Sequence, residues 1–182
     1  MAGKEKKVDS DLLAAICYKW PLAGFGNGFL YVSEELLKTY PPKSAGYNSC
    51  IGEDCISVYQ PSMKSYEPGH HDHVTFHRLG FALQTIKELG QDFIYLRITE
   101  LMDYPIEQLQ EAQISIVGDF YNENRLGILA IESKEGLFQH LLSKRVEASE
   151  RGGNIRIGLN YYNTEEDVDV FVKEVNNFTL SS

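Results

Sequence analysis

The spacing of hydrophobic and polar positions predicts one buried strand near the start of the chain. Gly28–Val32 is a short apolar run of β-forming residues, and Ser33 with the two glutamates after it is typical of a helix start. Residues 40–69 are rich in Pro, Gly, Ser, Asn and Tyr and have no sustained period. We therefore expect a strand, a short helix and then a long loop, and loops of this length are usually functional.

Two longer helices are predicted after this loop. The apolar face of the first consists of Leu79, Leu83, Ile86 and Leu89, with Gly90 at the position where such a helix ends. The second is marked by Leu96, Leu101 and Leu109. Because a proline removes a backbone hydrogen bond and crowds the preceding turn, Pro105 is expected to kink or split this helix after Tyr104.

The second half of the chain predicts a complete unit in the order ββαββα. The expected elements are strands over residues 114–117 and 126–131 joined by a polar turn at 119–125, a helix over 136–144, and a hairpin over 146–149 and 155–159. The last helix is expected to begin at Thr164, with Asp167 completing a capping box. Its buried face would consist of Val168, Phe171, Val172 and Val175.

The pattern as a whole indicates an α/β fold in two parts. One strand and two helices cannot enclose a sheet by themselves, so residues 1–91 are expected to belong to a larger domain. Residues 92–182 are expected to form a smaller α/β domain that is complete.

Composition and charge narrow the classes of function. The 182 residues are 43% hydrophobic and 24% charged, and the net charge of −9 argues against nucleic acid or an anionic membrane surface as the main partner. No stretch approaches the apolar length of a membrane span and the start has no hydrophobic signal segment, so a cytoplasmic protein is expected. Cys17, Cys50 and Cys55 form no Cys-x-x-Cys pair and are interpreted as reduced thiols.

Three segments in order share features with a known family. In residues 12–32, Tyr18 precedes Lys19, and a run of three alternating glycines that ends at Gly28 leads into the predicted strand. We interpret this glycine run as a tight turn, because it is not followed by the helix that a phosphate-binding loop requires. The second segment is Tyr-Glu-Pro-Gly at residues 66–69, followed by the helix that begins the Leu79 face.

The third segment is residues 153–169, where Arg156 on a predicted strand is followed by Tyr-Asn-Thr and an acidic helix start. We call residues 153–169 the closing signature. Together the three segments resemble the class V aminotransferase family of pyridoxal-phosphate (PLP) enzymes, a group that includes cysteine desulfurases and isopenicillin-N-epimerase-like proteins. The resemblance extends from about Leu12 to the C-terminus.

The resemblance implies a PLP-dependent reaction on an amino acid. Lys19 falls on the lysine that forms a Schiff base with PLP, and Arg156 falls on the arginine that holds the substrate carboxylate through two parallel hydrogen bonds. Tyr18 and His70 fall on cofactor-binding positions, and His70 is expected to touch the phosphate of a neighbouring subunit. An apolar, partly buried setting would leave the Lys19 amine free to react, and we expect it from Ala14, Ala15, Ile16 and Trp20.

The implied fold is the C-terminal part of a PLP-transferase, or aspartate-aminotransferase-like, fold. Residues 1–91 would be the remnant of the large PLP-binding domain, and residues 92–182 the small domain. The family's phosphate-cradling loop, ring-stacking residue and pyridine-pairing aspartate are expected to lie outside this sequence. We therefore expect the chain to act as a homodimer or with a complementary N-terminal half.

Two positions depart from the family. His70 stands where the family commonly has a threonine that reaches the cofactor phosphate. Cysteine desulfurases need a nucleophilic cysteine shortly before the arginine strand, whereas no cysteine follows Cys55 here, so desulfuration is disfavoured. Aminotransfer, epimerisation and lyase chemistry remain open.

Two other functions are considered from the residues. Four of the five histidines lie within residues 70–77, and the i, i+4 spacing of His73 and His77 is usable for zinc, although a polar helix start at Asp72 is the commoner explanation. The chain could instead be a non-catalytic interaction module, because the aromatic residues between Tyr40 and Tyr66 would suit an interface.

Overall fold

A computed structural model describes residues 10–52, 59–119 and 126–181 of the chain. The chain divides into two compact units, which we call the N-terminal unit (Met1–Ile86) and the C-terminal unit (Lys87–Ser182), and each is described by itself. The assignment of residues 1–91 to a larger parent domain and of residues 92–182 to a small one stays a prediction.

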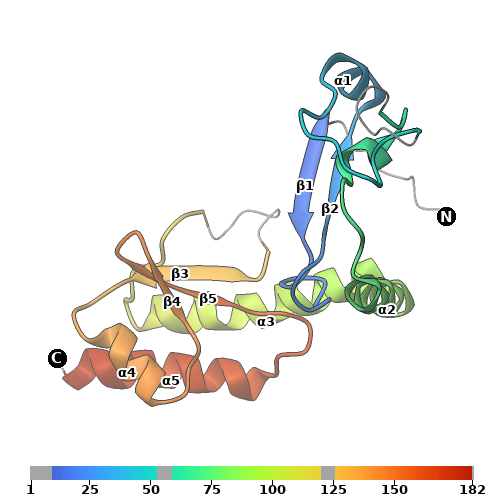
Figure 1. The fold of residues 1–182 in the computed structure, drawn as a ribbon. Coiled ribbons are helices and arrows are strands. Elements are labelled where there is room, and N and C mark those ends of the chain that lie inside the picture. Colours follow the sequence, from blue (N-terminus) through green and yellow to red (C-terminus); the bar gives the residue numbers. More distant parts are fainter. Residues whose placement is uncertain (1–9, 53–58, 120–125, 182) are drawn as a thin grey trace. The chain divides into compact units, whose positions relative to one another are not determined.

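The N-terminal unit is built around an antiparallel hairpin (Figure 1). Strand β1 (Leu12–Ile16) pairs with β2 (Gly28–Val32), and β2 confirms the predicted strand. Strand β1 has no counterpart among the predicted strands, because Leu-Leu-Ala-Ala-Ile lacks alternation and alanine has a low strand propensity. The two strands approach so closely that a Cβ atom on Gly28 would lie 2.6 Å from the Ala15 carbonyl oxygen.

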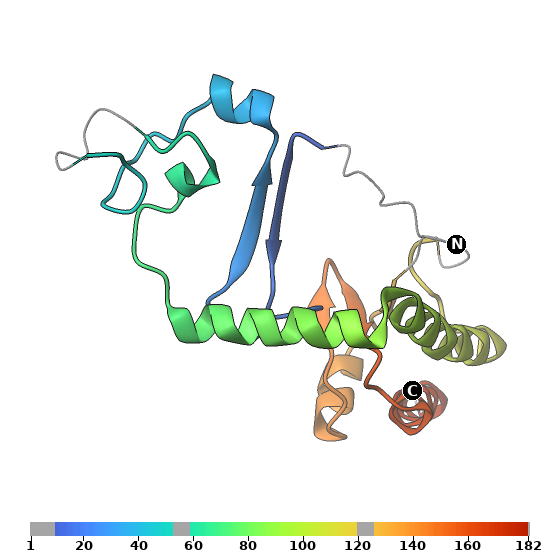
Figure 2. The same ribbon diagram turned by 90° about the vertical axis from the view of Figure 1, so that its right-hand side faces the viewer.

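A short helix and a long loop follow the hairpin, as predicted. Helix α1 (Glu34–Thr39) begins at Ser33, whose hydroxyl accepts a hydrogen bond of 3.3 Å from the Leu36 N–H. The loop contains the 3-10 helix η1 (Met63–Tyr66), whose Tyr66 hydroxyl donates to the Tyr40 carbonyl at 2.7 Å. Figure 2 shows the loop running from α1 back to the start of the next helix.

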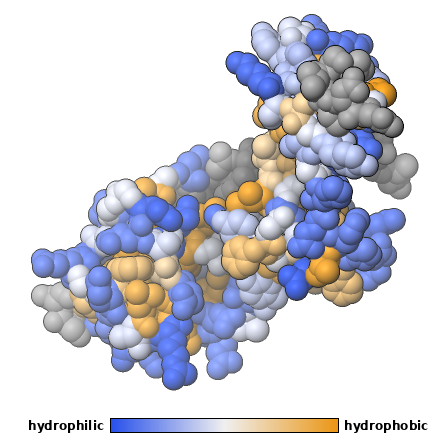
Figure 3. All heavy atoms as spheres, in the orientation of Figure 1, coloured by the Kyte–Doolittle hydropathy of each residue, from blue (hydrophilic) through white to orange (hydrophobic). Residues whose placement is uncertain are grey.

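Helix α2 (His73–Leu89) begins in the N-terminal unit and ends before Gly90, which has a φ of +85°. Its predicted apolar face is not buried by the described residues, since Leu83 and Leu89 are 51% and 38% exposed. The buried hydrophobic side chain of this helix is Ala82, which belongs to a small cluster with Cys17 and Ala23. Hydrophobic residues accordingly appear on the visible surface of the hairpin and of α2 (Figure 3).

The C-terminal unit begins with the long helix α3 (Gln91–Glu111). The helix continues through Pro105, so of the two predicted outcomes, a kink or a split after Tyr104, the split is wrong. Pro105 is buried on the face that carries Leu101 and Leu109, which are 2% and 0% exposed. Burying such side chains contributes about 1.5–3 kcal/mol each, so the two leucines together offset the cost of about 3 kcal/mol for an internal proline.

A three-stranded antiparallel sheet packs against the helices of this unit (Figure 1). Its order is β3 (Ile128–Glu132), β5 (Asn154–Gly158), β4 (Ser149–Arg151). The predicted hairpin turn is confirmed, with positive φ angles at Gly152 and Gly153, but its first strand begins at residue 149 rather than 146.

The predicted strand over residues 114–117 is reduced to a single bridge between Ile116 and Ile131. The Val117 N–H donates to the Ala130 carbonyl at 2.8 Å, so the segment lies along β3 without extending far enough to form a regular strand. Residues 120–125 of the predicted turn lie outside the described residues.

Helices α4 (Leu137–Ser143) and α5 (Glu165–Ser181) complete the unit. The capping box is confirmed, because the Thr164 hydroxyl accepts from the Asp167 N–H at 3.2 Å and the Asp167 carboxylate accepts from the Thr164 N–H at 3.0 Å. The buried face of α5 is confirmed at Val168, Phe171, Val172 and Val175. None of the helices in the described part of the chain is long and apolar enough to cross a membrane.

Candidate functional site

Lys19 lies in the connection between β1 and β2, on a backbone that is tightly constrained. The Cys17 N–H donates to the Asn27 carbonyl at 3.3 Å, and the Ala23 N–H donates to the Cys17 carbonyl at 2.9 Å. Positive φ angles occur at Leu22 (59°), Gly24 (73°) and Gly26 (88°). A side chain at such an angle is costly for a residue other than glycine, so the turn is held by its surroundings. The glycine run is therefore a tight turn, as predicted.

The Lys19 side chain is exposed. Its Nζ atom lies 5.7 Å from the centroid of the Tyr18 ring, and this ring stacks on Phe25 with centroids 5.0 Å apart. With the residues that the structure describes, the Lys19 amine makes no hydrogen bond and no ion pair. The amine is thus available for a reaction or a ligand.

The apolar setting expected around Lys19 is not closed within this chain. Ile16 and Trp20, two of the four residues expected to form it, are 53% and 36% exposed. The expectation of a partly buried amine is therefore wrong for the chain by itself. The physical reason is that two paired strands leave both of their faces uncovered unless another layer packs on them.

His70 lies in the loop before α2, where its ring stacks on Tyr47 with centroids 5.8 Å apart. It lines a cleft of about 790 Å³ within the N-terminal unit, together with residues of the hairpin, of η1 and of the first turns of α2. In the same cleft, His71 Nε2 lies 3.1 Å from Glu67 Oε2. The described lining of this cleft does not include Lys19, so the structure does not bring His70 and Lys19 into one cavity.

The histidine segment does not assemble a metal centre among the described residues. Within residues 10–52, 59–119 and 126–181 no three His, Cys, Asp or Glu side chains are grouped so that they could hold a metal ion. His77 Nδ1 lies 2.7 Å from the His73 carbonyl oxygen of its own helix. Asp72 caps this helix, and hydrogen bonds from the Thr75 hydroxyl and from the backbone lower the pKa of the Asp72 carboxyl.

Arg156 occupies the middle of β5, the central strand of the sheet. Its neighbours Ile155 and Ile157 are 1% and 7% exposed and face the core, so the half-buried Arg156 lies on the opposite face. Its guanidinium makes no hydrogen bond or ion pair with any residue that the structure describes. Arg156 belongs to the C-terminal unit, whereas Lys19 belongs to the N-terminal unit.

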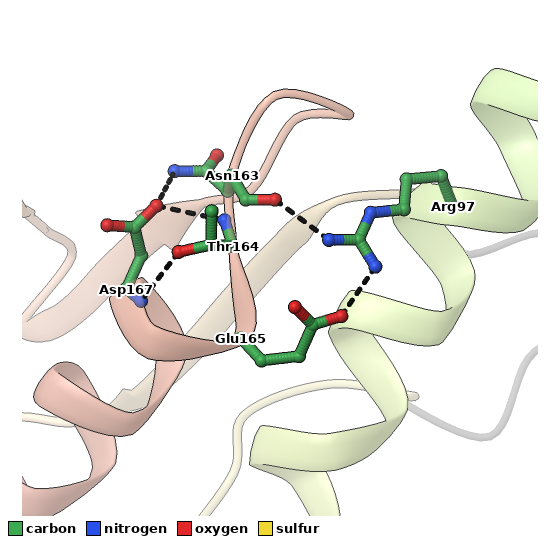
Figure 4. Close-up of polar contacts among 5 residues, drawn as sticks. All are labelled: Arg97, Asn163, Thr164, Glu165 and Asp167. Carbon is green, nitrogen blue, oxygen red and sulfur yellow. Dashed lines mark hydrogen bonds and ion pairs between the residues drawn. The ribbon is translucent and has the colours of Figure 1, made fainter.

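The predicted capping box at the start of α5 is part of a larger polar cluster that includes Arg97, and the role of Arg97 was not identified from the sequence (Figure 4). Arg97 on α3 donates to Glu165 Oε1 at 2.6 Å and to the Asn163 carbonyl at 3.1 Å. The Arg97 guanidinium lowers the pKa of Glu165, and the Thr164 N–H lowers the pKa of Asp167. Arg97 and Asn163 are 66 positions apart, and no local pattern could have paired them.

Residues 4–171 match the protein-family model described as aminotransferase class-V. The chain belongs to this family. The resemblance drawn from the three sequence segments is thereby confirmed. A comparison with curated proteins found no match.

Solved structures confirm the mixed α/β fold of this class-V chain. A cysteine desulfurase from Thermococcus onnurineus NA1 has a TM-score of 0.84 and 18% identity, over 95% of this chain and 48% of that protein. The cystine C-S lyase C-DES, in complex with cysteine persulfide, gives 0.83 and 18% over 93% and 47%. An alanine–glyoxylate aminotransferase from Nostoc sp. gives 0.65 and 17% over 93% and 48%. The chain spans about half the length of these proteins.

Class-V aminotransferases depend on PLP, and a variant of C-DES holds glycine covalently linked to this cofactor. The donor groups of the chain fit such a cofactor and its amino-acid substrate. Lys19 offers a primary amine for an aldehyde, Arg156 a guanidinium for a carboxylate, and His70 an imidazole for a phosphate. The described residues do not supply the enclosure that would exclude water from the Lys19 amine.

Proposed function

We propose that this class-V chain supplies the reactive lysine and the substrate-binding arginine of a PLP-dependent enzyme that acts on an amino acid. The observation that carries the proposal is the family match over residues 4–171, joined to an exposed Lys19 amine without polar partners in the described part of the chain. When bound, PLP supplies an aldehyde for an amine and a ring that withdraws electrons from the substrate Cα.

Each proposed residue has a distinct task. Lys19 would hold the cofactor through its amine, and the same amine, once displaced by the amine of the substrate, would move a proton at the substrate Cα. Arg156 binds the substrate carboxylate with two parallel hydrogen bonds, and its position in the central strand of a packed sheet gives it a fixed origin. Tyr18 contacts the cofactor beside the lysine. His70 donates to the cofactor phosphate of a neighbouring subunit.

The hairpin is proposed to be covered by another copy of this chain or by a complementary N-terminal half. One face of the hairpin exposes large apolar side chains, where Leu13 at 40% pairs with Tyr31 at 43% and Phe29 is exposed at 50%. Contiguous apolar surface is typical of an interface. Covering it would also close the setting around Lys19.

The reaction proposed is an aminotransfer, an epimerisation or an elimination. All three use a lysine at the substrate Cα and a cation at its carboxylate, which are the groups this chain offers. Desulfuration stays disfavoured, because it needs a nucleophilic cysteine ahead of the Arg156 strand and no cysteine follows Cys55.

A second candidate function is a non-catalytic interaction module. The same exposed apolar side chains of the hairpin favour it, because they would be covered in an assembly whether or not a cofactor binds. The two candidates differ in one respect: only the enzyme requires a covalent bond at Lys19.

Reductive trapping tests the proposal. The full chain is titrated with PLP, reduced with sodium borohydride, digested and mapped by mass. We expect one phosphopyridoxyl group, on Lys19, which disappears in Lys19→Ala. Lys38→Ala is the matched control, since Lys38 is an exposed lysine of the same unit that pairs with Glu34 at 3.9 Å, and it should leave the label unchanged. Labels scattered over surface lysines, or no label at Lys19, would contradict the enzyme and favour the interaction module.

A further inference from the structure

We infer that Asn27 is a positioning residue for Lys19, a role that rests on the function proposed for Lys19. Asn27 ends the turn that carries the lysine. Its Nδ2 group donates to the Ala23 carbonyl within the turn at 2.9 Å and to the Thr75 carbonyl in the first turn of α2 at 3.3 Å. One side-chain amide thus ties the lysine-bearing turn to a helix that lies 48 positions further along the chain.

The orientation of this amide is fixed by its partners. Both hydrogen bonds go to carbonyl oxygens, which only accept, so the NH2 group of Asn27 must face them. The Oδ1 atom is then buried, and no residue in the described part of the chain gives it a hydrogen bond. A buried acceptor without a partner costs free energy that an apolar side chain would avoid. An asparagine at this position is therefore explained by its two donors and not by its burial.

The helical end of this link is itself held in place. Asp72 accepts hydrogen bonds from the Thr75 N–H at 3.3 Å and from the Thr75 hydroxyl at 2.6 Å. The residue whose carbonyl binds Asn27 is thus anchored by the cap of its own helix. Moving the lysine-bearing turn away from α2 would therefore lengthen the hydrogen bond between Asn27 Nδ2 and the Thr75 carbonyl oxygen.

Apolar side chains of the turn and of α2 also pack together, but this packing does not fix the position of the turn along the helix. Cys17 and Ala23, which are 1% and 2% exposed, cluster with Ala82 of α2. The backbone of the turn also comes close to the helix, since a Cβ atom on Gly26 would lie 3.5 Å from Thr75 Cγ2. Because apolar contacts are non-directional, small side chains such as these can slide, whereas a pair of hydrogen bonds specifies one position.

Two variants of Asn27 test the role in the full chain. Asn27→Asp keeps the shape but presents acceptors to two carbonyls, and Asn27→Ala removes the amide. The matched control is Gln60→Ala, which removes another side-chain amide of the same unit that donates to a backbone carbonyl, that of Cys50, at 3.1 Å. The rate of phosphopyridoxyl labelling at Lys19 should fall about tenfold or more in both Asn27 variants, as is usual when a reacting group is displaced. The pH profile of that labelling should shift in the same variants, while Gln60→Ala should match the unmodified chain in both.

A cofactor-free measurement separates this inference from the proposed function. Hydrogen exchange of the peptide covering residues 17–27 should become faster in both Asn27 variants and stay unchanged in Gln60→Ala. If the unmodified chain takes no label at Lys19, the proposed function fails. If hydrogen exchange of residues 17–27 is also the same in the Asn27 variants as in the unmodified chain, Asn27 does not hold the turn against α2 either. If the label forms and the Asn27 variants retain its rate and its pH profile, Asn27 does not position Lys19. A fall in rate with an unaltered pH profile, accompanied by a lower thermal midpoint, would show a purely structural role and would likewise overturn the inference.

Discussion

The two units of this chain differ in how much of their own apolar surface they bury. In the C-terminal unit, the helices and strands share one core, and Leu109, Leu141 and Val175 are each 0% exposed. In the N-terminal unit, the buried cluster consists of three small residues with Leu79 beside it, while Phe81 on α2 is 77% exposed. The C-terminal unit thus forms a core of its own, whereas the N-terminal unit leaves large apolar side chains exposed.

The two proposed site residues, Arg156 and Lys19, differ in the same way. Arg156 lies on a sheet that is already packed, so the proposed carboxylate site is formed before any partner arrives. Lys19 lies on a turn whose backbone is constrained but whose surroundings are open. Substitutions in each unit test whether the two units also differ in stability.

The largest expected effect is a loss of core packing in the C-terminal unit. Leu109→Ala should lower the free energy of unfolding by about 2–5 kcal/mol, because it leaves a cavity in a closed core. Leu96→Ala on the same helix, where the leucine is 58% exposed, should cost less than about 0.5 kcal/mol. Urea unfolding followed by far-UV circular dichroism measures both.

The fluorescence of Trp20 sharpens this test. Trp20 is the single tryptophan of the chain and lies in the N-terminal unit, so its signal reports on the surroundings of a residue of that unit. We expect its unfolding midpoint to be unaffected by Leu109→Ala. A shift equal to that of the circular dichroism signal would mean that the two units unfold together, and the comparison would be wrong.

Backbone protection should show the same contrast. The hydrogen-bonded amides of β5 should exchange about 100-fold more slowly than those of β1, because β5 is the central strand of a packed sheet and an isolated two-stranded hairpin is only marginally stable. Hydrogen exchange with mass spectrometry measures both strands in one sample. Equal protection would show that the hairpin is stabilised by more than the described contacts.

A smaller effect is expected at the start of α5. Thr164→Ala removes the cap that accepts the Asp167 N–H and should cost about 1 kcal/mol of stability. Thr99→Ala is the control, because the Thr99 hydroxyl donates only within its own helix, to the Tyr95 carbonyl, and its loss should cost less than about 0.5 kcal/mol. Thermal unfolding of the C-terminal unit gives the comparison.

The smallest effect is the pH dependence of the same helix start. Because Arg97 lowers the pKa of Glu165 in the folded chain, this carboxylate stabilises the fold above its ordinary pKa of about 4.3, and its contribution is lost as the pH falls through the folded pKa. Glu165→Gln should therefore lower the thermal midpoint at pH 7 and have less effect near pH 3. Glu166→Gln, at the next position, is the control. A difference between Glu165→Gln and the unmodified chain that persists unchanged at low pH would exclude the ion pair as its cause.

Local signals were sufficient where a feature is decided within a few residues. The capping box of Thr164 and Asp167, the buried face of α5 and strand β2 all follow from spacings that can be counted along the chain. The family was accessible in the same way, because its segments around Lys19 and Arg156 are contiguous in sequence.

Features that depend on distant packing could not be predicted. Pro105 continues a helix because a core holds its face, and Arg97 pairs with Glu165 across 68 positions. Strand β1 forms because β2 lies beside it, although two of its five residues are alanines. The open surroundings of Lys19 were missed for the same reason, since hydrophobic neighbours in sequence do not enclose a side chain unless another layer packs on them.

The closing signature has a consequence for how such proteins decay over evolutionary time. Within it, the Asn163 side chain accepts a hydrogen bond from the Asn160 N–H at 2.9 Å and Thr164 caps α5, so a substitution of either residue weakens the C-terminal unit without removing a proposed site residue. The Lys19 amine, by contrast, makes no hydrogen bond or ion pair with the described residues and lies 5.7 Å from the Tyr18 ring centroid, so its loss would leave the fold almost unchanged. A lineage released from selection for catalysis should therefore lose Lys19 early and keep Asn163 and Thr164 of the closing signature long afterwards.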